Sequence, residues 1–317
     1  MADSGNNAGV RLIAPRPEQL GKPLFVFLPG MDGAGTLLQP QLDVLAPHFD
    51  VRCLSIPPTD DAGWNRLTHQ VVRLIREELT RAIRKVSASQ LNLPSAQPSS
   101  GPRKDLTKSS LTGRRRGRRK GLMQKDDGVD AISKPARRSV YLCGESFGGC
   151  LAMHVLTQAP DLFDRVVLVN PASSFRRLPW MQLGQMITQQ LPSTLYRYSA
   201  LGLVPFLINP FRVGPHERKS LEQAMGAVPP KTAAWRMSLL SGFELERLPL
   251  ERMAHPVLLV AGGRDRLLPS KREVQSLCGR FPNAQQHLLP NSGHACLLEN
   301  GVNLQKIMQQ YGFTGAR

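Results

Sequence analysis

The sequence contains no hydrophobic run long enough to cross a lipid bilayer. Its longest apolar stretch, from Tyr198 to Phe211, is interrupted by Pro205 and Asn209, whereas a membrane-spanning helix needs about 20 consecutive apolar residues. The first residues, MADSGNNAGVRLIAPRP, lack the basic and then apolar order of a secretory signal. These absences argue against an integral membrane protein and against a secreted one, and we expect an intracellular protein.

Cysteine is scarce and has no regular spacing. The five cysteines are Cys53, Cys143, Cys150, Cys278 and Cys296. Their number is odd and none of them forms a C-x-x-C pair, so the sequence indicates neither a disulfide framework nor a zinc site of the usual spacing. This usage fits a reducing compartment, and no metal or organic cofactor is implied.

Acidic residues are few, and the resulting positive charge is unevenly distributed. The chain has 41 Lys and Arg against 24 Asp and Glu, a net charge of +17. Between Ser87 and Ser139, 13 Lys and Arg stand against four Asp, a net charge of +9. This segment is rich in Ser, Pro and Gly and poor in aromatic and β-branched residues, so it cannot bury enough apolar surface to offset its ordering entropy. We predict that 87–139 is a disordered basic insertion.

The charge of this insertion is compatible with three roles. It can be a solvated loop, or it can contact an anionic membrane. Nucleic-acid binding is the least favoured role, because no aromatic residues for base stacking are interleaved with the basic ones.

Elsewhere, short apolar runs alternate with helical patterns. The runs are rich in Val, Leu and Ile and mostly lack polar alternation, which is typical of parallel strands covered on both faces. Predicted strands cover residues 23–30, 51–57, 139–144, 165–171, 256–263 and 284–290. One helical pattern places six apolar residues on one face: Leu67, Val71, Leu74, Ile75, Leu79 and Ile83. The order predicts a single α/β domain over 1–317, with a mostly parallel sheet and helices on both faces.

One long interval carries no strand pattern. From about 173 to 253 the sequence is helix-like and rich in Leu, Met and Pro. Because it falls between the fourth and fifth predicted strands, we predict a helical cap over 172–252, inserted between core strands. Its composition suits the lining of an acyl-chain slot, although simple packing on the core would explain it equally well.

A serine lies between glycines where a predicted strand meets a predicted helix. The pentapeptide Gly144-Glu145-Ser146-Phe147-Gly148 has the G-x-S-x-G form of a nucleophile elbow. Its glycines permit the sharp turn, and the helix N-terminus favours negative charge beside the hydroxyl. The pentapeptide alone is a weak signal, because glycine and serine are common here, so an ordinary turn serine is the alternative.

The residues around later strands favour catalysis. A serine hydroxyl needs a general base at neutral pH, and in this architecture the acid and the histidine follow the serine in chain order. Asp265 follows the strand predicted over 256–263, and His294 follows the last predicted strand. The other position for the acid, after the fourth strand, holds Asn170. We therefore predict an α/β-hydrolase with the triad Ser146, Asp265 and His294. The alternatives are that Asp265 is an ordinary loop carboxylate and that His294 is a structural histidine.

The oxyanion that forms in acyl transfer needs two backbone N–H donors. Phe147, directly after the nucleophile, supplies one. The loop after the first predicted strand, FLPGMDGAG, supplies the other, and Met31 is its natural donor. We expect Gly33 and Gly35 to let this loop approach the substrate closely.

Several stretches also carry a family resemblance. They are FLPGMDGAG, LSIPPTD, GESFGGCLA, LVNPASSF, LLSGFE, GGRDRLLPS and LPNSGHACLLENGVNL, within about residues 22–86 and 139–313. Through them the chain resembles the esterase, lipase and thioesterase part of the phytyl ester synthase family of plastids and cyanobacteria. The resemblance implies the same triad and an acyl-transferring serine enzyme. It also implies acyl donors such as a galactolipid, acyl-CoA or acyl carrier protein, and acceptors such as phytol or diacylglycerol.

One departure from that family bears on the acceptor. Many plant members continue into a second acyltransferase domain with an H-x-x-x-x-D motif, which this sequence lacks. Hydrolysis or transfer to a long-chain alcohol is therefore expected rather than transfer to diacylglycerol. The resemblance implies a cytoplasmic protein or one peripheral on a thylakoid or plastid-type membrane.

The sequence as a whole predicts a serine-dependent acyl hydrolase or acyltransferase. Its substrates would be lipid acyl esters or thioesters, converted through an acyl-serine intermediate. One alternative is a soluble small-ester hydrolase or thioesterase. An alternative from another class is a non-catalytic protein that binds anionic surfaces and uses the hydrolase fold as a scaffold.

Overall fold

The computed structural model describes residues 9–91, 138–179 and 201–314, together with residues 188, 192, 195 and 196. Most of the predicted basic insertion, residues 92–137, lies outside the described residues. The prediction made for that segment therefore stays a prediction.

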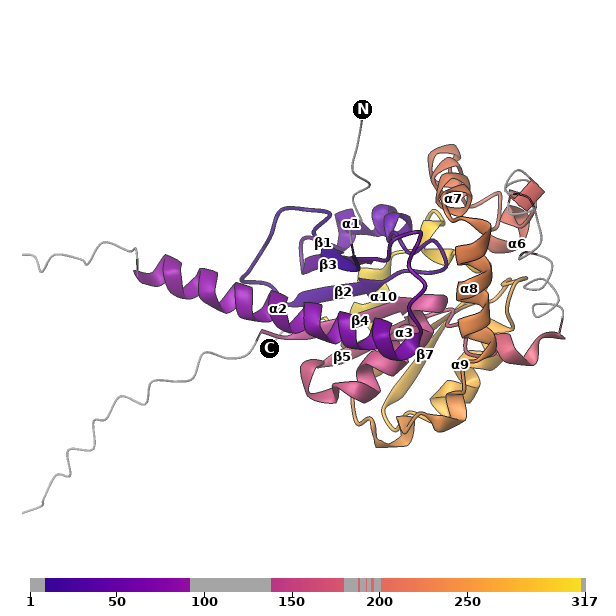
Figure 1. The fold of residues 1–317 in the computed structure, drawn as a ribbon. Helices are drawn as coiled ribbons and strands as arrows, with labels where there is room; N and C mark the ends of the chain where they lie inside the picture. Colours follow the sequence, from indigo (N-terminus) through magenta and orange to yellow (C-terminus); the bar gives the residue numbers. More distant parts are fainter. Residues whose placement is uncertain are drawn as a thin grey trace, which may run out of the picture.

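Seven strands form one sheet in the order β1-β3-β2-β4-β5-β6-β7 (Figure 1). The strands are β1 (Arg11–Ile13), β2 (Leu24–Leu28), β3 (Asp50–Ser55), β4 (Val140–Glu145), β5 (Arg165–Val169), β6 (Val257–Gly262) and β7 (Ala284–Leu289). All neighbours pair in parallel except β1, which is antiparallel to β3. The predicted class, a mostly parallel sheet with helices around it, is confirmed.

The six predicted strands correspond to β2 to β7, and only β1 was not predicted. It has three residues, lies at the sheet edge and is exposed at both ends. A strand this short shows no usable periodicity, so the sequence around Leu12 carries no strand signal.

Helices cover both faces of the sheet. The helices are α1 (Gln39–Leu45), α2 (Trp64–Leu91), α3 (Phe147–Gln158), α6 (Val204–Leu207), α7 (Pro215–Ala227), α8 (Pro230–Ser241), α9 (Ser270–Cys278) and α10 (Leu304–Gln310). Short 3-10 helices cover Thr36–Leu38, Pro160–Leu162, Phe175–Arg177, Leu245–Arg247, Leu250–Arg252 and Cys296–Leu298.

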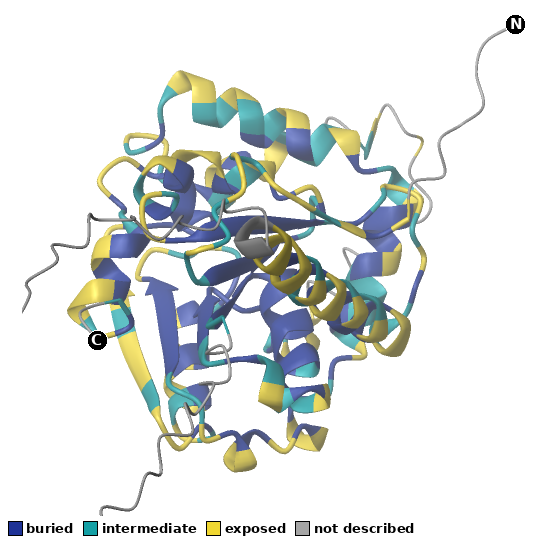
Figure 2. Cartoon of the chain, turned by 90° about the vertical axis from the view of Figure 1, so that its left-hand side faces the viewer, coloured by how far each residue is buried: buried dark blue, intermediate teal, exposed yellow. Residues whose placement is uncertain are grey.

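Alternate strand residues pack into two separate cores. Leu142 of β4 faces the core that includes α2, α3 and α9, whereas Cys143 faces the core that includes α1 and α10. Figure 2 shows the buried strands between helices whose outer faces are exposed. A sheet covered on both faces explains the near-continuous apolar runs in the sequence.

The apolar face predicted for the long helix is only partly buried. Leu67, Val71 and Ile75 are at most 2% exposed, as expected, but Ile83 is 63% exposed. The expectation that Ile83 belongs to the buried face is wrong, because the C-terminal part of α2 extends past the edge of the sheet (Figure 1).

Only helices occur in the described part of the interval between β5 and β6, at 172–179 and 201–252. Among them, α6, α7 and α8 lie together at one end of the sheet (Figure 1). Helix α8 also contacts α3. This arrangement places the interval beside the residues that follow β4.

A buried network of charges joins α2 to the sheet. Arg52 of β3 is 1% exposed and lies 2.5 Å from Asp50 and 2.7 Å from Glu78 of α2. Arg138 lies 2.5 Å from Asp50, and Arg81 lies 2.6 Å from Glu78. Burial acts to raise the pKa of Asp50, but the two arginines outweigh it and the pKa lies below its ordinary value. The network therefore holds Asp50 in its ionised form.

We expect Arg52→Met to lower the free energy of unfolding by about 3 kcal/mol, because it leaves two buried carboxylates short of a partner. Arg73→Met is the matched control, since the Arg73–Glu77 pair of α2 is exposed, and its loss should cost less than about 0.5 kcal/mol. Urea denaturation of both variants measures the difference. Equal stability of the two variants would contradict a structural role for the buried network.

Candidate active site

Ser146 lies in the tight turn between β4 and α3. Its φ of 54° is one of two positive values among the described non-glycine residues. An idealised Cβ on Gly148 would lie 2.0 Å from the carbonyl oxygen of Leu28, and one on Gly144 would lie 2.3 Å from that of Gly148. Both glycines are therefore required by the close approach of backbone segments, which holds Ser146 in this conformation.

The three residues predicted as a triad lie in one hydrogen-bonded row. Ser146 Oγ is 2.9 Å from His294 Nε2, and His294 Nδ1 is 2.7 Å from Asp265 Oδ2. Ser146 is 8% exposed and His294 4%. Because the carboxylate can only accept, Nδ1 carries the proton and Nε2 is left to accept from the serine hydroxyl.

Asp265 is held by donors from the segment that follows it. It accepts the N–H groups of Leu267 and Leu268, at 2.8 and 2.9 Å, and the hydroxyl of Ser270. Burial acts to raise the pKa of Asp265, but the charge of His294 and these donors outweigh it and the pKa lies below its ordinary value. Asp265 therefore remains a carboxylate at neutral pH.

The imidazole of His294 is shifted in the opposite direction. Burial acts to lower its pKa, but the charge and hydrogen bond of Asp265 outweigh burial, with smaller contributions from Glu145 and Glu273. The pKa of His294 consequently lies above its ordinary value of 6.5. The site stabilises the imidazolium form, which is the form that a general base passes through.

Asn170 fixes the position of the histidine loop. It follows β5 with a φ of 42°. Its Nδ2 donates to the carbonyl of His294 at 2.5 Å, and its Oδ1 accepts the N–H of Gly262 at 2.8 Å. The sequence analysis considered Asn170 only as a missing acid. Its amide instead joins the end of β6 to the histidine loop, a role that an amide can fill because it both donates and accepts.

Glu299 is a second residue whose role the sequence analysis missed. Its side chain is buried and accepts the N–H of Gly293 at 2.7 Å and the Nε–H of Arg212 at 2.9 Å. It therefore ties the residue before His294 to the segment after α6. The available signal was the LLE stretch that contributed to the family resemblance.

The two predicted oxyanion donors flank Ser146. An idealised Cβ on Gly30 would lie 3.7 Å from Cβ of Ser146, and Met31 lines the same cavity as Ser146. Phe147 is the first residue of α3, so its N–H has no acceptor within the helix. The structure thus places Phe147 next to the nucleophile in the chain and Met31 at the same cavity as Ser146, and their role as oxyanion donors stays a prediction.

The expectation for Gly33 and Gly35 is wrong. Both have a φ of +70°, but a Cβ on Gly33 would meet the guanidinium of Arg236 at 2.6 Å, and a Cβ on Gly35 would meet Cys53 at 3.0 Å. Neither glycine lines the cavity at Ser146. They shape the loop instead of approaching a substrate.

A cavity of about 370 Å³ opens over Ser146 and His294. Its wall is mostly apolar and comes largely from the helical interval, through Leu207, Leu221, Met225, Val228, Met237 and Leu240. Its polar lining beside the nucleophile includes Asp32 and Glu145. Burial raises the pKa of Glu145 to about 8, although the charge of His294 acts against it. The cavity has the size and lining of a site for an apolar ligand with one reactive polar group.

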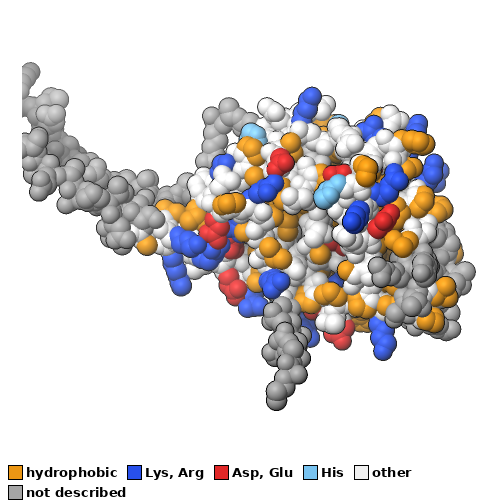
Figure 3. Space-filling view, turned by 90° about the horizontal axis from the view of Figure 1, so that it is seen from above, with side chains coloured by type: hydrophobic (Ala, Val, Ile, Leu, Met, Phe, Trp, Pro, Cys, Tyr) orange, Lys and Arg blue, Asp and Glu red, His pale blue; other side chains and the backbone are white. Residues whose placement is uncertain are grey.

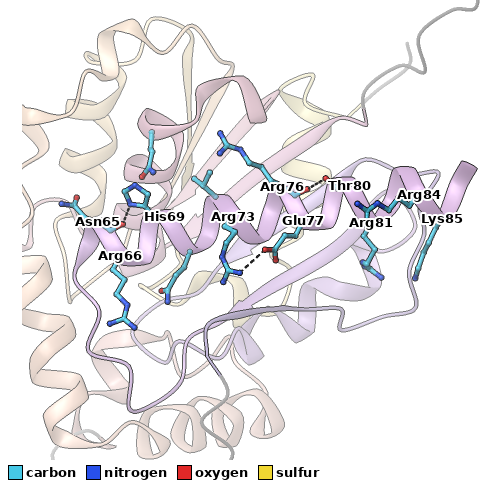
Figure 4. Close-up of a pocket in the computed structure, with 13 residues that line it drawn as sticks. Asn65, Arg66, His69, Arg73, Arg76, Glu77, Thr80, Arg81, Arg84 and Lys85 are labelled. Atoms are coloured by element: carbon cyan, nitrogen blue, oxygen red, sulfur yellow. Dashed lines mark hydrogen bonds and ion pairs between the residues drawn. The ribbon is translucent and has the colours of Figure 1, made fainter.

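A second hollow runs along the exposed face of α2 (Figure 4). Six basic residues line it, namely Arg66, Arg73, Arg76, Arg81, Arg84 and Lys85. None of the predicted site residues lines it. The hollow is therefore positively charged but lacks the paired nucleophile and base of the first cavity. Across the described ranges, no cluster of His, Cys, Asp and Glu could hold a metal ion, and no helix is long and apolar enough to cross a membrane.

Comparisons with known proteins agree on the kind of fold. The Hydrolase_4 family model, described as serine aminopeptidase, S33, matches residues 126–301. The enol-lactonase from Burkholderia xenovorans LB400 superimposes with a TM-score of 0.65 at 13% identity, covering 96% of each chain. The α/β-hydrolase fold predicted from the elbow is confirmed.

Two relatives extend the comparison. Phytyl ester synthase 1, chloroplastic, of Arabidopsis thaliana is 27% identical over 312 residues, which cover 92% of this chain and 37% of that protein. Pimeloyl-[acyl-carrier protein] methyl ester esterase of Xanthomonas oryzae pv. oryzae is 26% identical over 198 residues, covering 58% of this chain and 73% of that protein. The resemblance to phytyl ester synthases is confirmed, although the chain spans little more than a third of the length of the first relative.

The His294 imidazole should titrate above 6.5, so its neutral form should become dominant only at a higher pH than in a free histidine. In Asp265→Asn the opposing charge is lost while burial remains, and the pKa of His294 should fall below that of the native protein. NMR titration of the imidazole resonances in both proteins measures these values. A native value at or below 6.5 would contradict the electrostatic description of the site.

Proposed function

The chain belongs to the Hydrolase_4 family of α/β-hydrolase enzymes, and we propose that it cleaves or transfers lipid acyl groups through an acyl intermediate on Ser146. The observation that carries the proposal is the row from Ser146 Oγ through His294 to Asp265, which opens into an apolar cavity. No other described cavity combines a hydroxyl, a base and a carboxylate in this order.

In the first step, His294 Nε2 takes the proton of the Ser146 hydroxyl while Oγ attacks the carbonyl carbon of an ester or thioester. The carbonyl oxygen becomes an oxyanion, and the N–H groups of Met31 and Phe147 stabilise it. Asp265 orients the imidazole and stabilises its protonated form. When the intermediate collapses, the imidazolium gives its proton to the departing alcohol or thiol and the acyl group stays on Ser146.

In the second step, water or an alcohol enters the same position. His294 takes its proton, the new oxygen attacks the acyl carbon, and a second oxyanion forms between the same donors. Collapse releases a carboxylic acid or a new ester and returns the proton to Ser146 Oγ. Which product forms depends on whether an alcohol excludes water from the cavity.

The shape and lining of the cavity support an acyl chain as the part of the substrate that it holds. We propose that the helical interval over 172–252 acts as a cap whose leucines and methionines contact that chain. The lipid donor would be a galactolipid, acyl-CoA or acyl carrier protein, and the acceptor a long-chain alcohol such as phytol. The name of the first relative supports a phytyl ester as the product.

A second candidate is hydrolysis of a smaller acyl ester or thioester. It is supported by the name of the second relative, a pimeloyl-[acyl-carrier protein] methyl ester esterase that is 26% identical over 198 residues. The same cavity and the same row of residues would serve this reaction, with water in the second step.

Contact with a membrane is part of the proposal. Phe211 is 97% exposed, Phe206 48% and Leu203 43%, and Leu203 also lines the cavity. Figure 3 shows Lys and Arg side chains spread from the projecting end of α2 across the face of the molecule. Apolar side chains near the cavity and a positive surface together suit peripheral binding to an anionic bilayer. The location would be cytoplasmic or peripheral on a thylakoid or plastid-type membrane.

Incubation of the purified protein with a galactolipid and phytol should release free fatty acid, phytyl ester or both. Ser146→Ala should lower either product by at least roughly 1,000-fold while leaving the melting temperature nearly unchanged, because the triad acts as a unit. A fluorophosphonate should label the native protein and not the variant. A variant that retains a tenth of the native activity would overturn the role of Ser146. Turnover of a small soluble ester by the native protein, with neither product formed from the galactolipid, would favour the second candidate.

Replacing residues 92–137 by a flexible Gly/Ser linker should leave turnover of a water-soluble ester and the melting temperature unchanged, since the cost of closing a loop grows only slowly with its length. Binding to anionic vesicles should weaken, most clearly at low salt, because screening already suppresses the interaction at high salt. Sedimentation with vesicles at two salt concentrations measures this. Equal binding by both proteins would remove the insertion from the membrane contact, and lost soluble-ester activity would make it part of the site.

A further inference from the structure

Arg236 of α8 is a buried cation that faces the loop after β2. The residue is 2% exposed. Its Nη1 donates to the carbonyl of Met31 at 2.6 Å, and its Nη2 donates to that of Pro57 at 3.2 Å. Its hydrogen bonds go to backbone carbonyls. No carboxylate among the described residues lies within ion-pair distance, although the charges of Asp32 and Asp60 stabilise its charged form against burial.

The rest of α8 already supplies contacts that dock the helix. Thr232 donates to the carbonyl of Pro58, and the indole of Trp235 donates to that of Ala62 at 3.3 Å. These contacts reach the loop after β3 and do not touch Met31. Burying an arginine that makes no direct ion pair is costly, and α8 already has these other hydrogen bonds to the loop after β3. The contact that distinguishes Arg236 is the one to Met31.

The loop that carries Met31 is restrained from two sides. From within the loop, Asp32 Oδ2 accepts the N–H groups of Ala34 and Gly35 at 3.0 and 3.2 Å. From α8, the guanidinium lies so close to Gly33 that a Cβ there would be 2.6 Å from Nη1. Met31 thus cannot shift without breaking its bond to Arg236 or displacing a buried charge.

We propose that Arg236 is a positioning residue for the oxyanion site. By holding the Met31 carbonyl, it restrains the backbone of the residue whose N–H is proposed to donate to the acyl oxygen beside Ser146. The donor geometry at the nucleophile then depends on the docking of a helix in the proposed cap. This inference rests on the proposed function, since it requires that Met31 donates to an oxyanion.

The test compares Arg236→Met with Thr232→Val as the matched control. Thr232→Val removes a hydrogen bond between the same helix and the adjacent loop without touching Met31. Each protein is assayed with p-nitrophenyl acetate and with its thiono analogue, in which sulfur replaces the carbonyl oxygen. Sulfur is a weaker hydrogen-bond acceptor, so the ratio of oxo to thiono rates reports how well the oxyanion donors are aligned.

Arg236→Met should lower kcat for the oxo ester by roughly 10- to 100-fold. This loss is no larger than the loss of kcat that follows removal of one oxyanion donor. KM should stay within about twofold and the oxo-to-thiono ratio should fall by about tenfold, the order expected when one donor is misaligned. Thr232→Val should keep the native ratio. An unchanged ratio in Arg236→Met, or an equal fall in Thr232→Val, would overturn the inference.

Arg236→Lys keeps the test decisive if the methionine variant does not fold. Lysine retains the charge but cannot reach Met31 and Pro57 together with one planar group, so its ratio should fall between those of the native protein and Arg236→Met. A native ratio in a folded lysine variant would overturn the inference. Failure of the proposed function would give a different result. In that case the native protein would not cleave the oxo ester through Ser146, whereas failure of this inference alone would leave native activity intact and change only the comparison of the variants.

Discussion

The amide of Asn170 is the contact on which the geometry of the site depends. It donates to the carbonyl of His294 and accepts the N–H of Gly262. One side chain therefore links the end of β5, the end of β6 that leads to Asp265, and the loop that carries His294. The row from Ser146 to Asp265 spans residues that are far apart in sequence, and this connection helps to hold the segments of Asp265 and His294 at their observed distance.

The electrostatics of the site follow from the same packing. Asp265 and His294 are buried together, and each holds the other in its charged form against the effect of burial. For Glu145, beside the nucleophile, burial outweighs the charge of His294 and raises the pKa to about 8. Two carboxyls near one imidazole thus have opposite protonation preferences at neutral pH. The difference leaves Asp265 as the anion beside His294, and in the proposed mechanism it keeps a second negative charge away from the oxyanion.

The sequence was sufficient to predict the elements that have strong local signals. The apolar runs predicted β2 to β7, and the elbow with its chain order predicted that Ser146, Asp265 and His294 would meet. β1 was missed because three residues at an edge show no periodicity. Ile83 was assigned to the buried face because helical spacing does not reveal where the sheet beneath a helix ends.

The roles of the residues that hold the site through tertiary contacts had no local signal, although Asn170 and Glu299 lie in stretches that carried the family resemblance. The three residues are Asn170, Glu299 and Arg236. Asn170 and Arg236 act through hydrogen bonds to backbone groups more than 100 residues away in the sequence. Gly33 and Gly35 were expected to face a substrate because glycines in a loop indicate a turn. The sequence does not show what that turn packs against. Burial of a polar side chain is the property that would have identified these residues, and burial is a product of the fold.

The helical interval is connected to both halves of the site. Arg212 binds Glu299, and the carbonyl of Leu207 accepts the N–H of Ala295, directly after the histidine. On the opposite side, Arg236 binds Met31. The segments that bear His294 and Met31, the proposed base and oxyanion donor, are thus each attached to the helices that line the cavity. If the proposed acyl substrate displaced these helices to enter, both attachments would loosen, so the cavity wall and the groups proposed to act on the acyl carbonyl would be ordered together in the arrangement seen here.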